Sequence, residues 1–387
     1  MAIIRSVSIL NFRSIQKLDW NPKPGINCLI GPGDTGKSSI IDAIDLCLGA
    51  RRNLQISDSD FYALNVEVPI EISVTLGALP DSLKSFETYG LYLQGLDLES
   101  GEISDEPGKD LESVLILKLT IESDLEPQWS LISERAHSQG QQRSINWKDR
   151  LDIAPTRLGS VSDYHFGWKR GSLLQKLADE KADASTALIQ AAREVRSNFG
   201  DQANEQLKET LKKVTKAADD LGVPVGESAQ ALIDANSLSF SGGTISLHDD
   251  KSIPLNKLGL GSSRLLIAGI QSAVAVNTSI ILVDELEHGL EPHRIIRLLE
   301  TLGAKKATPK IQVFMTTHSP VVVRELSGDQ LMIMRRKSRK HQIKAAGTSD
   351  SVQGTIRRFP EALLAPRILV CEGASEVGLM RGLDQYY

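Results

Sequence analysis

The sequence predicts an α/β fold with a mixed, mainly parallel central sheet, a β-rich amino-terminal lobe and a helical insertion. Three observations support this prediction. Residues 26–48 combine a short apolar run, a turn of small residues and a helical pattern. Residues 66–76 and 113–123 alternate between apolar and polar side chains, as half-buried strands do. The pieces 279–285 and 311–319 each contain a continuous apolar run, which is typical of parallel strands buried on both faces.

Composition limits the classes of protein to which the chain can belong. Its 387 residues are 41% hydrophobic and 24% charged, an ordinary globular balance with length enough for two or three cores. Cys28, Cys47 and Cys371 lie far apart, which argues against a disulfide framework or a thiolate zinc site. No apolar run approaches the roughly 20 residues that span a bilayer, so we expect a cytoplasmic protein with no membrane partner. The net charge of -5 argues against a generally basic surface that coats nucleic acid.

The middle of the chain has a different texture. Residues 171–221 are rich in Ala, Leu, Lys, Glu and Gln, and their apolar side chains recur at helical intervals. This spacing predicts two helices joined near 198–202. Such a pair either covers its own domain or forms a dimer surface, and the sequence leaves both interpretations open. Residues 239–244, "SFSGGT", precede a strand pattern and predict a hairpin turn.

The turn after the strand 26–30 carries a phosphate-binding motif. It fits the pattern GxxxxGK[ST], and the strand before it and the helix 38–48 after it are the context that the motif needs. We expect backbone N–H groups at the start of the helix to surround phosphate oxygens, Lys37 to reach the β- and γ-phosphates, and Ser38 to ligate Mg²⁺. The predicted nucleotide-binding residues of this turn are Gly31, Pro32, Gly33, Asp34, Thr35, Gly36, Lys37, Ser38 and Ser39.

A second motif supplies the carboxylates that ATP hydrolysis needs. Four apolar residues lead into Asp284 and Glu285, which is a Walker B pattern. Asp284 would belong to the Mg²⁺ shell, and Glu285 would orient or deprotonate the attacking water. The next apolar strand ends near His318, which either contacts the γ-phosphate or is a buried, hydrogen-bonded core histidine. The chemistry of the residues leaves these two interpretations of His318 open.

The order of these motifs resembles that of the ABC-type ATPases of the recombination-protein and chromosome-maintenance class, over most of residues 1–330. The resemblance implies ATP and Mg²⁺ as cofactors, Glu285 as the hydrolytic glutamate, residues 287–294 as the D-loop region and His318 as the switch histidine. It also implies a signature motif at a helix amino terminus, which faces the γ-phosphate bound by a second subunit.

Two segments compete for the role of that signature. Residues 239–244 are closer to it in letters, but they lie too far before Asp284 and precede a strand pattern. Residues 258–264, "LGLGSSR", lie at the family's usual interval and run into a helical pattern. We therefore assign nucleotide contact to Gly259, Gly261 and Ser262. The segment departs from the family at two positions, Leu260 and Ser263, so we expect slow hydrolysis or closure that depends on another partner.

The end of the sequence predicts a strand that ends at Glu372, a glycine turn and a helix that carries Glu376. This EGxxE pattern resembles the start of a Toprim domain, where such glutamates act with a later Asp-x-Asp to hold divalent metals for phosphodiester cleavage. The resemblance implies a catalytic role for Glu372 and a second divalent-metal site at Glu372 and Glu376. That site is incomplete here, because the chain reaches Tyr387 before such aspartates. The alternative is a carboxylate that caps a turn.

An ABC-type ATPase with a helical insertion and a Toprim start resembles the overcoming-lysogenization-defect (OLD) family of nucleases, which includes Gabija-like antiphage effectors. The resemblance implies a homodimer or higher even-numbered oligomer, joined through the ATPase part and the insertion, whose nucleotide state controls a DNA endonuclease. It also implies DNA and a companion defence protein or nucleic acid as partners. The alternative function is an ATP-gated DNA clamp or repair scaffold without cleavage.

The basic run 335–341 is either a solvated hairpin loop or a DNA-phosphate contact.

These motifs define the expected domain order. The amino-terminal part of the ABC-type ATPase covers 1–165, and the helical dimerisation region covers 166–235. The second ATPase part covers 236–350. Residues 351–387 hold a linker and the first β-α unit of an incomplete Toprim domain.

Overall fold

The computed structural model describes most of the chain and divides it into two units. It describes residues 2–50, 54–158, 205–220, 246–274, 280–337 and 340–386, with single positions between 159 and 204. One unit comprises Met1–Val161 and Gly259–Tyr387, and the other comprises Ser162–Leu258. Residues 351–387, predicted to hold a linker and a Toprim start, therefore group with the larger unit.

The smaller unit contains the helical region that the sequence predicts. Helix α7 (Lys208–Asp220) forms where the second helix of the pair is expected. The first helix of that pair, its junction at 198–202 and the hairpin turn at 239–244 lie outside the described residues.

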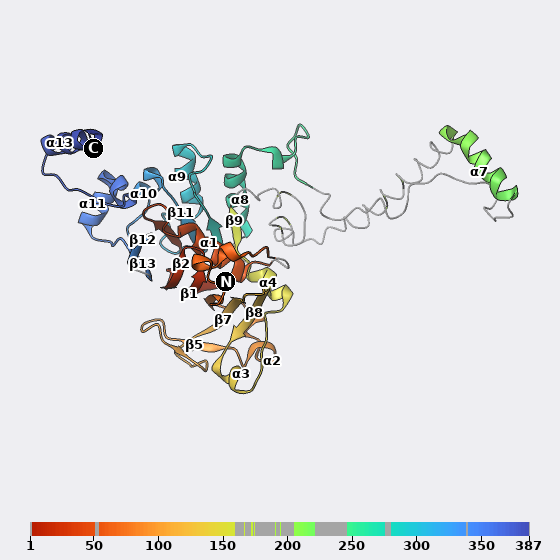
Figure 1. Ribbon diagram of the computed structural model, residues 1–387, viewed down its shortest axis with the longest axis horizontal. Coiled ribbons are helices and arrows are strands. Elements are labelled where there is room, and N and C mark those ends of the chain that lie inside the picture. The colour runs from red at the N-terminus through yellow and green to blue at the C-terminus, as the bar shows by residue number, and fades with distance from the viewer. Residues whose placement is uncertain are drawn as a thin grey trace. The chain divides into compact units, whose positions relative to one another are not determined.

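An antiparallel sheet forms the β-rich lobe of the larger unit (Figure 1). Its described strands follow the order β2-β1-β4-β7-β5-β6, and β8 also pairs with β7. The strands are β1 (Ile3–Phe12), β2 (Ile15–Trp20), β4 (Ile70–Gly77), β5 (Gln94–Leu96), β6 (Ile103–Ser104), β7 (Glu112–Ile121) and β8 (Pro127–Ile132). The alternating runs 66–76 and 113–123 contain β4 and β7, so the structure confirms the strands predicted there.

A mainly parallel sheet forms the centre of the same unit. Its described strands follow the order β13-β12-β3-β11-β10-β9, and the pairing is parallel throughout except between β12 and β13. The strands are β3 (Ile26–Ile30), β9 (Thr156–Leu158), β10 (Ile280–Val283), β11 (Gln312–Thr316), β12 (Leu331–Lys337) and β13 (Lys340–Ala345). Every residue of β3, β10 and β11 is buried, which confirms the sequence prediction of strands covered on both faces.

The larger unit also contains helices and short 3₁₀ turns. The α-helices are α1 (Lys37–Leu48), α2 (Phe86–Tyr89), α3 (Glu134–Ser138), α4 (Trp147–Ile153), α8 (Leu260–Val274), α9 (Pro292–Thr301), α10 (Pro320–Glu325), α11 (Asp350–Arg358), α12 (Pro360–Leu364) and α13 (Ala374–Tyr386). The 3₁₀ turns of this unit are η1 (Asp58–Asp60), η2 (Tyr62–Leu64) and η3 (Asp81–Lys84), and η6 (Leu255–Lys257) belongs to the smaller unit. Among the described helices, none has the length and apolar character that a bilayer crossing requires.

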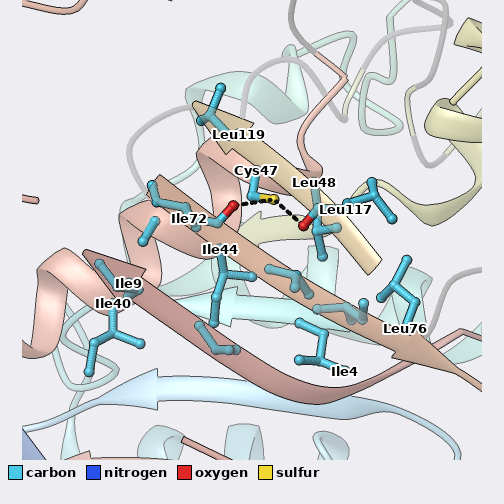
Figure 2. Packing of buried hydrophobic residues seen from close by; sticks show 14 of the residues in the cluster. Ile4, Ile9, Ile40, Ile44, Cys47, Leu48, Ile72, Leu76, Leu117 and Leu119 are labelled. Carbon is cyan, nitrogen blue, oxygen red and sulfur yellow. Dashed lines mark hydrogen bonds between the residues drawn. The ribbon is translucent and has the colours of Figure 1, made fainter. Parts of the chain in front are cut away.

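Helix α1 links the two sheets of the larger unit. It packs on β4 and β7 of the antiparallel sheet and on β10 and β11 of the parallel sheet. Ile40 and Ile44 are fully buried in this contact, together with Ile72 and Leu119 (Figure 2). The Cys47 thiol also lies there and donates to the Ile72 carbonyl oxygen at 3.5 Å. The amino terminus of α1 is therefore held at a defined place beside the parallel sheet.

Candidate functional site

The phosphate-binding motif forms the connection between β3 and α1. Gly36 caps α1 with a φ of 90°, and a Cβ there would lie 2.6 Å from Ser14 Oγ. Gly31 has a φ of 141°, and a Cβ there would lie 2.5 Å from the Met334 carbonyl oxygen. Both positions therefore require glycine, for backbone conformation and for space. At Gly33, by contrast, no described atom lies within 4 Å of such a Cβ.

The remaining predicted residues of the turn lie in or beside the same connection. Asp34 has a φ of 55°, an uncommon left-handed value for a residue with a side chain. Thr35 Oγ1 donates to the Pro32 carbonyl oxygen at 3.0 Å and so closes the turn. Ser39, in the first turn of α1, has its Oγ 3.5 Å from that of Ser14.

The Lys37 ammonium lies over the turn that precedes it. Its Nζ donates to the carbonyl oxygens of Pro32 at 2.7 Å and Gly31 at 3.1 Å, and the residue is buried. Burial lowers the pKa of Lys37, against the opposing effect of the Asp34 and Asp284 carboxylates. The turn thus holds a cation over its own carbonyl oxygens, in the connection that leads into α1.

Three oxygen-bearing side chains meet at the start of α1. Ser38 Oγ donates to Asp284 Oδ1 at 2.9 Å, although the two residues are 246 positions apart. Thr316 Oγ1, at the end of β11, donates to the same Asp284 oxygen at 2.6 Å. The parallel pairing of β10 and β11 places the carboxyl ends of both strands at one edge of the sheet. The structure therefore brings together Ser38 and Asp284, the two Mg²⁺ ligands predicted from the sequence.

Glu285 follows Asp284 in a conformation that points its carboxylate outward. Its φ is 47°, and its backbone N–H donates to Thr316 Oγ1 at 2.8 Å. Its side chain is 56% exposed, and Glu285 Oε2 lies 3.5 Å from His288 Nδ1. An exposed carboxylate at the strand edge is accessible to a water molecule, as a general base must be.

His318 follows β11, and its exposure decides between the two interpretations that the sequence left open. His318 is exposed, so the alternative of a buried core histidine is wrong. Its backbone N–H donates to Glu287 Oε1 at 2.7 Å, and the neighbouring Thr317 Oγ1 donates to Glu287 Oε2 at 2.6 Å. Glu287 therefore connects the loop after β10 to the loop after β11.

The predicted signature lies at the start of α8, as its helical pattern indicates. Gly261 packs against the loop after β10, where a Cβ would lie 2.6 Å from the Gly289 carbonyl oxygen. Ser262 Oγ accepts a hydrogen bond from Arg294 Nη1 at 3.0 Å. At Gly259, a Cβ would meet no described atom within 4 Å. The signature and the D-loop region thus form one surface of this chain.

Arg264 joins the signature helix to the loop that carries Glu285. Its Nη1 donates to the carbonyl oxygens of Glu285 at 3.0 Å, Leu286 at 3.3 Å and His288 at 3.1 Å. Burial lowers the pKa of the Arg264 guanidinium, and the carboxylate of Glu287 is the strongest of three that oppose this. The positive φ of Glu285 is therefore supported by a buried side chain from α8.

The residues at this edge of the sheet fit ATP and Mg²⁺. Gly31 and Gly36 keep side chains away from the turn, as a close approach of phosphate to backbone N–H groups requires. Lys37 supplies a positive charge, and Ser38 with Asp284 supplies hard oxygen ligands of the kind that Mg²⁺ prefers.

The carboxy-terminal prediction is partly wrong. Helix α13 confirms the predicted helix, but residues 367–372 form no strand. Ile368, Leu369 and Val370 are 56%, 65% and 89% exposed, and no described strand pairs with them. A single apolar run without a hydrogen-bonding neighbour has no means to satisfy its backbone as a strand. Within the described residues, no group of three or more His, Cys, Asp and Glu side chains is placed to hold a metal.

The structure of the basic run 335–341 differs from the solvated hairpin loop that was one of its two interpretations. Arg335 and Arg336 belong to β12, Lys340 and His341 belong to β13, and the strands pair as far as Lys337 with Lys340. Arg336 Nη2 donates to Tyr62 Oη at 2.9 Å, and His341 is buried. Cross-strand pairing extends further than the turn-forming letters suggested, so most of the run is sheet.

Three residues that hold the site together received no individual role from the sequence, although Arg264 lies in the predicted signature segment and Glu287 in the predicted D-loop region. They are Arg264, Glu287 and Thr316, which hydrogen-bond to the loops after β10 and β11. Thr316 is the last residue of a buried strand, and a polar residue there is a signal that could have identified it. Arg264 and Glu287 have no such signal, because Arg264 bonds to backbone carbonyl oxygens and Glu287 bonds to a backbone N–H and the Thr317 hydroxyl, which no local pattern pairs with them.

Comparison with known proteins supports an ATPase fold. A family model described as "AAA domain, putative AbiEii toxin, Type IV TA system" matches residues 26–324. The chain is 24% identical over 376 residues to a protein of Helicobacter pylori named "ATP/GTP phosphatase". The match covers 88% of this chain and 91% of that protein. Over 57 residues it is 35% identical to the "DNA replication and repair protein RecF" of Porphyromonas gingivalis, 15% of this chain and 16% of that one.

Among solved structures, the chain resembles an Smc head domain with an extended coiled coil, bound to the C-terminal domain of ScpA and derived from Pyrococcus furiosus. The TM-score is 0.50 at 12% identity, and the match covers 89% of this chain and 96% of that chain. At this identity the likeness shows the fold alone, which is that of an α/β ATPase with one antiparallel and one mainly parallel sheet.

Proposed function

The chain belongs to the AAA domain family whose model matches residues 26–324, and we propose that it binds and hydrolyses ATP at the edge of its parallel sheet. The observation that carries this proposal is the hydrogen bond of 2.9 Å between Ser38 and Asp284. It places a hydroxyl and a carboxylate beside the turn that precedes α1, which is the arrangement that a Mg²⁺-bound triphosphate needs.

Each residue of the site has a distinct role in this proposal. The N–H groups at the start of α1 and the Lys37 ammonium hold the β- and γ-phosphates. Ser38 and Asp284 hold Mg²⁺, which when bound neutralises charge on the phosphate oxygens. Glu285 orients the attacking water and accepts its proton, and the exposed imidazole of His318 donates to a γ-phosphate oxygen.

The site is completed by a second copy of this chain. The amino terminus of α8, with Gly259, Gly261 and Ser262, presents N–H groups and the positive end of a helix dipole. Those groups belong to a surface that also includes the loop after Glu285, since Gly261 packs on Gly289. A homodimer in which this surface faces the partner's phosphates would join two sites.

Two substitutions test the ATPase proposal. Lys37→Ala removes the phosphate-binding cation and should abolish ATP binding, measured by calorimetry with Mg²⁺ present. Glu285→Gln should retain binding and block turnover, because an amide cannot accept the proton of the attacking water. Glu300→Gln, which changes an exposed carboxylate on α9, is the matched control. Turnover by Glu285→Gln at the parental rate would show that Glu285 is not the base.

DNA binding controlled by nucleotide is a second candidate function. The local similarity to RecF favours it, as do the exposed Lys340 and Lys344 on β13. A protein that neutralises phosphates loses DNA affinity as salt rises, and removing a contact reduces that slope. Reversing both charges to Glu should therefore lower DNA affinity and flatten its salt dependence. Unchanged affinity and slope would remove β13 from any DNA contact.

A DNA endonuclease output with a role in antiphage defence, as the resemblance to the OLD family implies, is the finer form of the ATPase proposal, in which the nucleotide state controls cleavage. Its support is the spacing of Glu372 and Glu376 at the start of α13. Two carboxylates supply fewer oxygen ligands than a two-metal cleavage site uses. We therefore expect this chain to show no Mg²⁺-dependent cleavage of plasmid DNA, and robust cutting by it would contradict that expectation.

A further inference from the structure

The Glu287 carboxylate uses both of its oxygens to hold the peptide that carries His318. Oε1 accepts the His318 backbone N–H at 2.7 Å, and Oε2 accepts the Thr317 hydroxyl at 2.6 Å. Thr317 is fully buried, and its Oγ1 also accepts the Ser319 backbone N–H at 3.0 Å. One carboxylate therefore determines the path of three consecutive residues after β11.

The segment that carries Glu287 is itself held from the other side. Arg264 donates to the carbonyl oxygens of Glu285, Leu286 and His288, on either side of Glu287 in sequence. A carboxylate on a segment fixed in this way is a rigid support, because its own backbone cannot follow the group that it holds. Hydrogen bonds to a charged acceptor are also among the stronger ones in proteins.

The His318 side chain depends on this support for its direction. Its imidazole is exposed, and the peptide from which it projects is bonded to Glu287. Glu287 Oε1 meets the backbone and not the ring. This hydrogen bond therefore acts on the imidazole through the position of the peptide.

We propose that Glu287 is a positioning residue, which holds the His318 peptide so that the imidazole meets the γ-phosphate of bound ATP. The catalytic part of this inference rests on the proposed ATPase function. Misplacing a reacting group by about 1 Å is enough to cost about 100-fold in rate. Glu287 acts here by geometry, and not as a second base beside Glu285.

Two substitutions at this position separate geometry from charge. In Glu287→Gln, the amide oxygen can still accept the His318 N–H, and the amide nitrogen can donate to Thr317 Oγ1, since a hydroxyl works in either sense. Glu287→Ala removes both contacts. We expect kcat to fall about 10- to 100-fold in Glu287→Ala, with KM for ATP nearly unchanged, and to fall far less in Glu287→Gln. Equal losses in the two variants would overturn the proposal.

A double-mutant cycle tests whether the effect passes through His318. We expect Glu287→Ala to cause no further loss of kcat in a His318→Ala background, because no imidazole remains to be positioned. If the two substitutions instead lower kcat by independent factors, Glu287 acts on a group other than His318. Glu300→Ala, an exposed carboxylate on α9, is the matched control and should leave the cycle unchanged.

A measurement that needs no turnover keeps this inference separate from the ATPase proposal. In protein labelled with ¹³C-histidine, His318→Asn identifies the ring resonance of His318. That resonance should move in Glu287→Ala and stay near its parental position in Glu287→Gln and Glu300→Ala, with denaturant unfolding confirming that each variant is folded. An unmoved resonance in Glu287→Ala would overturn the positioning role. If the parental chain has no ATPase activity, the proposed function is wrong. The His318 resonance would still show whether Glu287 positions the imidazole.

Discussion

Thr316→Val tests the network that joins the two carboxyl-terminal strand ends. Thr316 Oγ1 donates to Asp284 Oδ1 at 2.6 Å and accepts the Glu285 N–H at 2.8 Å, and the residue is 1% exposed. A hydrogen bond to a charged group contributes about 1.5–3 kcal/mol, and a buried N–H left without a partner costs about 1–3 kcal/mol. Asp284 and the Glu285 N–H are both partly accessible to water, which reduces both of these contributions.

We therefore expect Thr316→Val to lower the free energy of unfolding by about 2–3 kcal/mol, measured by urea denaturation without nucleotide. Thr355→Val is the matched control, because this exposed threonine on α11 bonds to the Ser351 carbonyl within its own helix. The control should stay within about 0.5 kcal/mol of the parent. A Thr316→Val chain with parental stability, unfolding with the same denaturant slope, would refute the assignment of this network.

Three further predictions concern the turn and the helix that follows it. Gly36→Ala forces a Cβ to 2.6 Å from Ser14 Oγ at a φ of 90°, so both thermal stability and ATP affinity should fall. Ile44→Ala, which empties a fully buried site on α1, should cost about 2–5 kcal/mol of unfolding free energy while leaving the start of the helix in place. Burial raises the pKa of the Cys47 thiol from 9.0 to about 12. The contribution of this shift to the unfolding free energy is therefore complete below pH 9.0 and is lost as pH rises toward about 12. Cys47→Ala should therefore lose less unfolding free energy than the parent at alkaline pH, measured by urea titrations at increasing pH.

Periodicity and composition were sufficient to predict the elements that carry the site. Strand β3, helix α1 and the buried strands β10 and β11 all form where the apolar runs and the glycine turn indicate. These predictions succeed because each depends on local features: an unbroken apolar run, a helical spacing, or glycines at positions of positive φ. The same local logic failed at residues 367–372, because a strand also needs a neighbour, and no local pattern supplies one.

The polar contacts of the site could not be predicted in the same way. The sequence identified Asp284, Glu285 and His318 as candidates, but it placed Glu287 only within the D-loop region 287–294. The positioning role of Glu287 follows from two hydrogen bonds to the end of another strand. It also left His318 equally suited to a buried position, which its exposure in the fold excludes. Burial and hydrogen bonding depend on which segments become neighbours.

The amino-acid sequence by itself determined the chemical inventory of this protein: a glycine turn suited to phosphate, a lysine, a serine and an acidic pair at the end of a buried strand. Only the tertiary structure decided that Ser38 and Asp284 share a hydrogen bond and that Arg264 and Glu287 hold the loops around them. The physical reason is the distance along the chain over which each kind of interaction acts. Steric and periodic preferences act over a few residues, whereas a hydrogen bond requires two groups to meet within about 3 Å, which only the folded chain arranges.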